Sequence, residues 1–346
     1  MLAAAAVAAH AQTPAAGSAP ASESPYKLSG LVFGDYYYFG QAHDPAWEGE
    51  DGLWFRRIYF TFDYSFTPQV TTRLQIEMNS NGKLEGGLLT PYVKDASLSW
   101  TFSGRQQLIL GMHPSIAIHH VESVWGLRHV EKTPLDLYKL DSSRDTGVSI
   151  AGPMNGAATL KYQIQFGNDS GNGSETDRFK AIRAALLYKG PSGLVLESMY
   201  GYFAHDAHAN RTVGQAVVGY GRGRARAAFQ YALQQRHARD GTSDPDLRLD
   251  IFSGFVVADL KPQKFSVFAR VDRFADPCPD CASIDYLPID TTTEFTLLIA
   301  GAEFYVIPSV RFSPNVEWVA YSAPADSAIA KPKNDIVWRA TFYWVW

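Results

Sequence analysis

The stretch of sequence that decides the fold lies at the end of the chain, where residues 335–346 read D-I-V-W-R-A-T-F-Y-W-V-W. Successive side chains of an extended strand point to opposite faces. One face of this strand is apolar and largely aromatic, and it carries Ile336, Trp338, Ala340, Phe342, Trp344 and Trp346. The other face is mixed, and it carries Val337, Arg339, Thr341, Tyr343 and Val345. This division favours a strand between lipid and water; the alternative is an edge strand of a soluble β-sandwich.

The same alternation recurs along most of the chain. Residues 57–66 place Ile58, Phe60 and Phe62 on one face, opposite Arg57, Tyr59 and Thr61. About sixteen strands of about ten residues follow residue 26, and short turns alternate with long loops between them, as in bacterial outer-membrane barrels. A soluble sandwich gives no reason for the long loops to gather at one end. We therefore expect an all-β fold: a transmembrane antiparallel β-barrel of about 16 strands over residues 26–346, with short periplasmic turns and long extracellular loops.

Composition excludes several other classes. The 346 residues contain no apolar run of the length that a transmembrane helix needs. The net charge of -4 argues against a nucleic-acid partner. No cofactor is expected, and no pairing of a nucleophile with a base suggests an enzyme.

The N-terminal residues predict export. Residues 1–11 are small and apolar, and Ala9-His10-Ala11 has the A-x-A form of a signal-peptidase site. No basic residue precedes this run, so we expect the given sequence to start inside a longer signal peptide; the alternative is a low-complexity alanine tail. Residues 12–25, rich in Ala, Ser and Pro, are expected to form a flexible lead-in to the barrel.

The longest irregular segment covers residues 113–145 and corresponds to the third long loop. Loops of this length in compact folds are usually functional, so we expect this loop to fold into the pore and narrow it. Its charges are mixed in sign, and its four histidines suggest either polar loop residues or a metal site, of which the first is preferred. The expected constriction residues are His119, His120, Glu122, Arg128, Lys132, Lys139 and Arg144.

Sixteen strands leave an aqueous lumen, so the expected function is that of an outer-membrane porin through which small hydrophilic solutes diffuse passively. Arginines lining a narrow channel favour anions. The arginines assigned to the lumen wall are Arg57, Arg73, Arg183, Arg224, Arg226, Arg270, Arg311 and Arg339. In the alternative interpretation these are wall charges balanced by Asp63, Glu77, Asp95, Asp272, Glu303 and Glu317.

Two segments together with the terminal strand carry a resemblance to a known family. Residues 55–66 read F-R-R-I-Y-F-T-F-D-Y-S-F and residues 132–152 read K-T-P-L-D-L-Y-K-L-D-S-S-R-D-T-G-V-S-I-A-G. The chain resembles the outer-membrane porins grouped with the phosphate-selective porins O and P. The resemblance implies a Gram-negative outer membrane, a homotrimer, an inward-folded third loop and an anion preference that extends to phosphate in some members. Trp346 resembles the C-terminal aromatic signal of such barrels, which implies the barrel-assembly machinery as a partner besides outer-membrane lipid and the solutes.

Cys278 and Cys281 are the only cysteines. A thioredoxin-like redox role lacks its βαβ context and a zinc site lacks two further ligands, so we expect a local disulfide in an external loop. Two rival functions stay open: a barrel enzyme with its site at the rim, and a non-conducting receptor or adhesion barrel. Both rivals predict no ion flux.

Overall fold

The computed structural model describes residues 24–79, 88–241, 246–278, 281, 284, 286–324 and 330–346. The expected signal segment (1–11) and nearly all of the expected lead-in (12–25) lie outside the described residues. No helix in the described part of the chain is long and apolar enough to cross a membrane.

Within the described residues, sixteen strands form one closed antiparallel barrel, which confirms the predicted fold class. Each strand pairs with its neighbours in the chain, and β1 closes the ring by pairing with β16. The strands are β1 (Tyr26–Gln41), β2 (Asp51–Ser65), β3 (Val70–Asn79), β4 (Thr90–Phe102), β5 (Gln106–Pro114), β6 (Arg144–Pro153), β7 (Leu160–Gly167), β8 (Ala181–Lys189), β9 (Leu194–Phe203), β10 (Arg211–Arg222), β11 (Ala225–Arg236), β12 (Leu247–Lys261), β13 (Phe265–Phe274), β14 (Phe295–Ile307), β15 (Val310–Tyr321) and β16 (Asp335–Val345).

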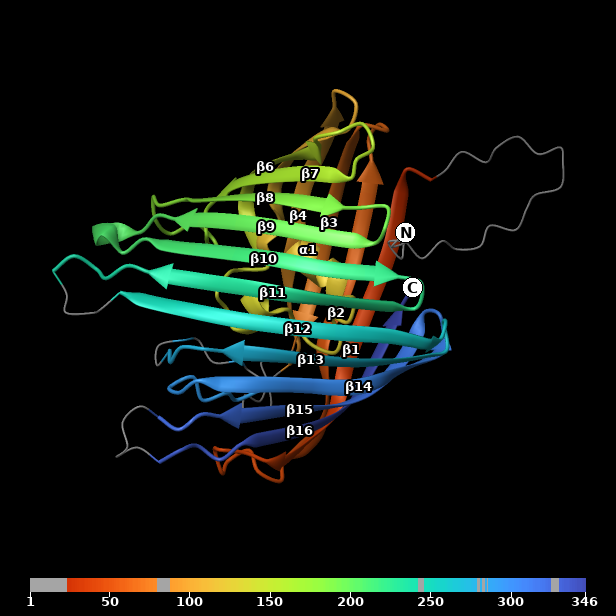
Figure 1. Ribbon diagram of the computed structural model, residues 1–346. Helices are drawn as coiled ribbons and strands as arrows, with labels where there is room; N and C mark the ends of the chain where they lie inside the picture. Colours follow the sequence, from red (N-terminus) through yellow and green to blue (C-terminus); the bar gives the residue numbers. More distant parts are fainter. Residues whose placement is uncertain are drawn as a thin grey trace.

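Short turns and long loops lie at opposite ends of the barrel. In Figure 1 the C-terminus and the β10–β11 turn both lie at the right, and the loop after β9 lies at the left with the single turn η1 (Asp206–His208). Below, the long loops are numbered in chain order, so the third loop (residues 115–143) joins β5 to β6 and the seventh (residues 275–294) joins β13 to β14.

The alternation of side chains follows the expected two faces. In β16, Trp338 is 55% exposed on the outer surface, whereas its neighbours Val337 and Arg339 are buried inside. The outer surface of the other strands carries large apolar side chains such as Leu110, Phe229 and Val256. The outer surface is therefore suited to lipid.

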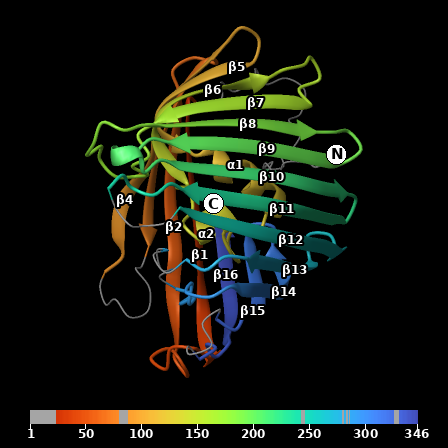
Figure 2. The ribbon, with the colours of Figure 1, turned by 60° about the vertical axis from the view of Figure 1, so that its left-hand side comes forward.

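The inside of the barrel is filled on one side. The third loop contains two helices, α1 (Ile116–Trp125) and α2 (Pro134–Leu137), and α1 packs against β8, β9 and β10. Figures 1 and 2 both show α1 within the ring of strands. This confirms that the third loop folds inward. The buried cluster inside includes wall residues of β10 and β12–β16, namely Val213, Leu249, Ile251, Phe268, Leu297, Ile299, Val319 and Val337.

Trp346, after the end of β16, bonds to Gly30 near the start of β1. Gly30 N–H donates to the Trp346 carbonyl and Trp346 N–H donates to the Gly30 carbonyl, both at 3.1 Å. The Trp346 ring lies directly over Gly30, because a Cβ atom added to Gly30 would come within 1.9 Å of that ring. Only glycine leaves space for this contact.

We predict that Gly30→Val displaces the Trp346 ring and destabilises the closed barrel by about 1–3 kcal/mol, the usual cost of overpacking. The measurement is the temperature at which the folded, fast-migrating band on a denaturing gel converts to the unfolded band. Gly254→Val is the matched control, because its added Cβ would meet no atom closer than 3.9 Å. Equal conversion temperatures for both variants would contradict this role of Gly30.

Candidate functional site

Helix α1 is amphipathic and lies with its apolar side on the barrel wall. Ser115 caps its first turn by accepting a hydrogen bond from Ala117 N–H at 3.4 Å. Gly126 ends it in the left-handed conformation at φ 70°, which favours glycine. Val121 and Trp125 are buried against the wall, and His119 on the opposite side is exposed to the lumen.

Polar side chains of the wall hold the backbone of the third loop. The loop runs through the barrel away from neighbouring strands, so its carbonyl groups need donors from side chains or water. Five wall residues from four different strands supply them. The bonds are Gln215 to Ala117 O (2.7 Å), Arg226 to Trp125 O (3.0 Å), Arg56 to Val130 O (2.8 Å), Arg270 to Lys132 O (2.5 Å) and Gln234 to Leu140 O (2.5 Å).

Ion pairs fix the two halves of the same loop. Arg183 is fully buried and contacts Asp141 and Asp145, each at 2.8 Å. His129 Nε2 lies 2.6 Å from Glu303 Oε2 on β14. These pairs thus attach the third loop to the wall between α1 and α2 and again after α2.

Three of the arginines expected to line the open channel do not reach it. Arg183, Arg270 and Arg339 do point inward, but the inward-folded loops cover them, and their exposed fractions are 0%, 1% and 3%. For these three the prediction is wrong, because alternation along a strand shows which face is inner and not what covers that face.

The remaining five arginines differ in position. Arg73 lines the larger cavity described below and Arg57 is mostly covered, whereas Arg226 is bonded to the loop carbonyl given above. Arg311 is mostly covered and pairs with Glu303 at 3.4 Å. Arg224 is exposed beside the β10–β11 turn, at the rim of the barrel.

The six acids proposed as balancing charges all have basic partners. This pairing is what the alternative interpretation of the sequence described, and it leaves little uncompensated positive charge on the wall. The pairs are Arg73–Asp63 (2.7 Å), Arg57–Glu77 (2.8 Å), Arg144–Asp95, Arg270–Asp272 (2.5 Å), Arg311–Glu303 (3.4 Å) and Arg339–Glu317 (3.0 Å).

Two β-bulges add charged residues that strict alternation does not predict. The register between β1 and β2 shifts at Phe33/Gly34, so Arg56 and Arg57 both turn inward. The register between β3 and β4 shifts at Gln75/Ile76, so Lys94 and Asp95 both turn inward. Bulges re-aim side chains in this way next to functional sites. The signal in the sequence is a pair of consecutive charged residues within a strand.

Two groups of charges lie inside the barrel, one on the wall and one on the third loop. The wall group consists of Arg57, Glu77, Lys94, Asp95 and Arg144, and the loop group consists of Glu122, Arg128, Lys132 and Asp136. The two groups act on each other, since Arg144 opposes the rise in the pKa of Glu122 and Lys94 helps to lower that of Asp136. With histidines neutral, five cations face four carboxylates.

The ionisation of the loop group reflects its burial. Burial raises the pKa of Glu122, with Arg128 opposing. Against the effect of burial, Lys132 and Arg128 lower the pKa of Asp136 to about 2. Burial lowers the pKa of Lys132 to about 8, although Asp136 opposes it. The charge of the loop group is therefore sensitive to mildly alkaline pH through Lys132.

Two cavities lie on either side of these groups. The larger, of about 620 Å³, is toward the short turns and is lined by residues of β2–β7 together with His119 and His120 of α1. The smaller, of about 350 Å³, is toward the long loops and is lined by Lys132, Asp136, Lys139, Asp169 and Arg211 among others. The seven residues expected at the constriction thus lie in these cavities or in the charge groups between them. The described residues contain no group of His, Cys, Asp and Glu side chains that could hold a metal ion.

The seventh loop also enters the barrel, which the sequence did not predict. Tyr286 donates from its hydroxyl to Glu131 at 2.7 Å, and its ring lies 4.6 Å from the Arg56 guanidinium. Arg339 donates to the Tyr286 carbonyl at 3.0 Å. The seventh loop therefore supports the third loop from the side of β1 and β16.

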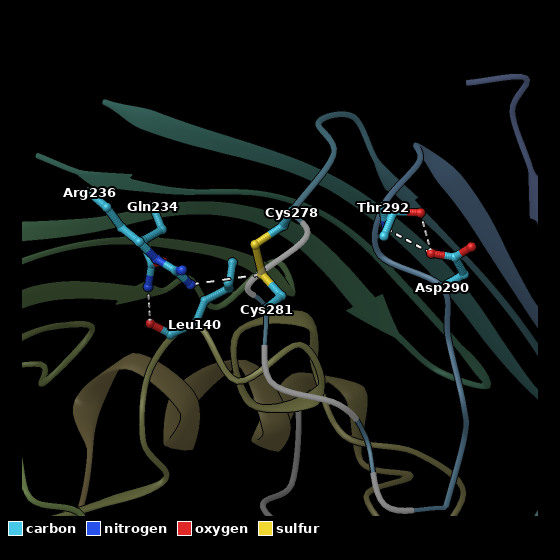
Figure 3. The surroundings of a disulfide bond; sticks show 7 residues. All are labelled: Leu140, Gln234, Arg236, Cys278, Cys281, Asp290 and Thr292. Atoms are coloured by element: carbon cyan, nitrogen blue, oxygen red, sulfur yellow. Dashed lines mark hydrogen bonds between the residues drawn. A yellow bond between two sulfur atoms is a disulfide. The ribbon is translucent and has the colours of Figure 1, made fainter. Parts of the chain in front are cut away.

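A disulfide joins Cys278 and Cys281 in the seventh loop, with an S–S distance of 2.08 Å. The sequence predicted a local disulfide in an external loop. The disulfide is present, but the loop is not external, because Cys278 is completely buried. Figure 3 shows the bond above Leu140 of the third loop, with Arg236 directed at Cys281 Sγ at 3.8 Å. The disulfide is part of the packing between the two inward loops and the wall.

Comparisons with known proteins identify the fold and no closer relationship. No family model matches the chain, and no curated protein matches it. Among solved structures, the anion-selective porin of Comamonas acidovorans superposes with a TM-score of 0.64 at 10% identity, covering 93% of this chain and 99% of that one. OmpF of Salmonella typhi gives a TM-score of 0.65 at 10% identity, covering 92% and 97%. OmpT of Vibrio cholerae, an outer-membrane protein in its trimer form, gives 0.60 at 11%, covering 93% and 99%. The chain thus has a porin-type barrel.

We predict that removing the hydrogen bond from Arg270 to the Lys132 carbonyl loosens the third loop without opening the barrel. In Arg270→Met combined with Asp272→Asn, no buried carboxylate is left unpaired, but the bond to the Lys132 carbonyl is lost. A hydrogen bond of this charge-assisted kind is worth about 1.5–3 kcal/mol. We expect faster proteolysis within the third loop and larger, noisier single-channel currents.

Arg222→Met is the control for this pair, since Arg222 is exposed at the short-turn end of β10. Unchanged proteolysis and current in the double variant, with the control also unchanged, would show that the loop does not depend on Arg270.

Proposed function

We propose that the protein is an outer-membrane porin, a water-filled channel through which small hydrophilic solutes diffuse passively. The observation that carries the proposal is the third loop held inside a closed barrel, with a polar cavity on each side of the charges that it faces. A porin needs an outer surface suited to lipid and a polar, narrowed inner path, and this barrel has both. The enzyme and receptor alternatives have no specific observation in their favour.

The selectivity we propose is a modest preference for anions. The five cations and four carboxylates of the two groups leave one net positive charge at the constriction, and fixed charge in a narrow path selects its counter-ion. Most of the wall arginines are already paired, so the strong phosphate selectivity implied by the resemblance needs its own test.

The setting we propose is the outer membrane of a Gram-negative bacterium, reached by export with a signal peptide cleaved after Ala11. Trp346 is proposed as the signal read by the barrel-assembly machinery. A homotrimer is supported by the trimeric form of the OmpT barrel with which this chain shares its fold. Current steps that appear in groups of three on insertion into a bilayer would support the trimer, and single steps would contradict it.

The proposal is tested by single-channel recording of the detergent-refolded protein in a planar bilayer under a salt gradient, with and without added phosphate. We expect discrete steps with a reversal potential on the anion side. Current that phosphate reduces far more than chloride does would extend the proposal to phosphate. A correctly folded, heat-modifiable barrel that carries no current would refute the porin function.

The pKa of Lys132 yields a test of the anion preference. With a pKa of about 8, Lys132 is charged in about nine-tenths of channels at pH 7 and in about one-tenth at pH 9. The constriction then loses its net positive charge, so we expect the ratio of anion to cation permeability to fall toward one over this range. Lys132→Arg is the control, because arginine stays charged and should hold the ratio constant. A wild-type ratio that does not change with pH would exclude Lys132 from the selectivity filter.

A further inference from the structure

Lys161 in the larger cavity and Lys189 close to it differ from the other bases of the lumen. Lys161 on β7 faces the cavity, and Lys189 on β8 lies two positions from Leu187, the cross-strand partner of Lys161. Residues in this diagonal relation are close enough for long side chains to meet. Neither lysine forms an ion pair within the described part of the chain, whereas Arg57, Arg73 and Lys94 are all paired.

The two lysine charges act on the same small region of α1. Burial lowers the pKa of His120 to about 4, and His119, Lys189 and Lys161 add to the effect. Although its side chain faces the lumen, the enclosure of His119 within the barrel removes it from bulk water and also lowers its pKa, with Arg144 and Lys189 contributing. Both imidazoles are therefore neutral at pH 7, and each offers one N–H donor and one acceptor beside two unpaired cations.

The rest of the cavity wall is a band of hydroxyl and amide groups. It crosses the inner face from β3 to β7, since Thr71 pairs with Ser99 and Ala151 pairs with both Gln107 and Gln163. Its members that line the cavity are Thr71, Thr72, Ser97, Ser99, Gln107 and Gln163. Such groups form hydrogen bonds with the hydroxyl groups of a solute. They carry no charge, so a charged group of the solute needs a partner outside this band.

We propose that this cavity is a binding site for a polyhydroxylated organic acid, such as a sugar acid, whose carboxylate lies between Lys161 and Lys189 and whose hydroxyl groups contact the polar band and the two histidines. The proposal rests on the porin function and names its substrate class. The volume of about 620 Å³ holds such a solute with water around it. An inorganic anion would satisfy the lysines and leave the band unused.

The test is the block of ion current by gluconate added at the short-turn side of the wild-type channel in potassium chloride. We expect a saturable reduction by gluconate that neither acetate nor glucose produces at the same concentration, because each lacks one of the two features. Phosphate or acetate acting as strongly as gluconate would overturn the proposal and leave a simple anion site.

Substitution of the lysines tests the position of the site. In Lys161→Gln combined with Lys189→Gln, we expect the half-blocking concentration of gluconate to rise by about tenfold or more, since two charge-assisted contacts are lost. The control is Lys264→Gln, which removes an exposed lysine from the β12–β13 turn at the same end of the barrel and should leave the block unchanged. An equal effect of both variants would indicate general attraction of anions and overturn the site.

The two proposals fail in distinguishable ways. A channel that conducts without block by gluconate retains the porin function and loses the site. Equilibrium binding of gluconate to the detergent-folded wild type and double variant is measured in parallel, so a barrel without current still tests the site. Absence of a difference in binding between the two overturns it.

Discussion

The structure depends on hydrogen bonds from the barrel wall to the backbone of a loop that has no strand beside it. Carbonyl groups of the third loop lie inside the barrel, where an unsatisfied one is costly. The donors are the side chains of Gln215, Arg226, Arg56, Arg270 and Gln234. Each of these residues lies at a position where strand alternation or a bulge directs its side chain inward. The loop's apolar side chains then join those of the wall in one buried cluster. The open lumen is what remains on the side of β2–β7.

This arrangement explains the charge balance of the interior. A guanidinium placed under a loop is removed from water, and a buried cation is tolerated only with a partner of opposite charge. Arg183, Arg270 and Arg339 accordingly have carboxylates at 3.0 Å or less. The acids of the wall therefore follow from the arginines that hold the loops, and they reduce the positive field that the same arginines would otherwise give the channel.

The sequence predicted the barrel well and the role of its arginines poorly. Period-two alternation is a local property, so the strands and their two faces could be predicted from it, whereas the inward third loop was expected from its length and from the family resemblance. Which inner positions are covered depends on contacts between segments far apart in the chain, and alternation carries no record of them. The apolar residues at inner positions of β12 and β14, such as Ile251 and Leu297, were an available signal, since an open aqueous lumen has no use for them.

The bulges and the seventh loop were missed for different physical reasons. A bulge inserts one residue and shifts the alternation beyond it, so Arg56 and Lys94 were passed over, although paired charges within a strand marked both places. The seventh loop enters because Tyr286 combines an apolar ring for the interior with a hydroxyl for Glu131. One tyrosine in a loop of mixed composition gives no pattern to recognise.

Arginine and lysine have different roles inside this barrel. The guanidinium presents several donors in a planar fork, so Arg270 bonds a loop carbonyl and the carboxylate of Asp272 at once. Lysine carries a compact, strongly hydrated charge that suits an open cavity. Lys161 lines such a cavity and Lys189 lies close to it; neither forms an ion pair within the described residues, although the Glu197 carboxyl is near enough to act on Lys189. It follows that the number of basic residues on the inner face does not measure how strongly the channel attracts an anion. The attraction depends on those basic residues that neither bind the inward loops nor pair with a carboxylate.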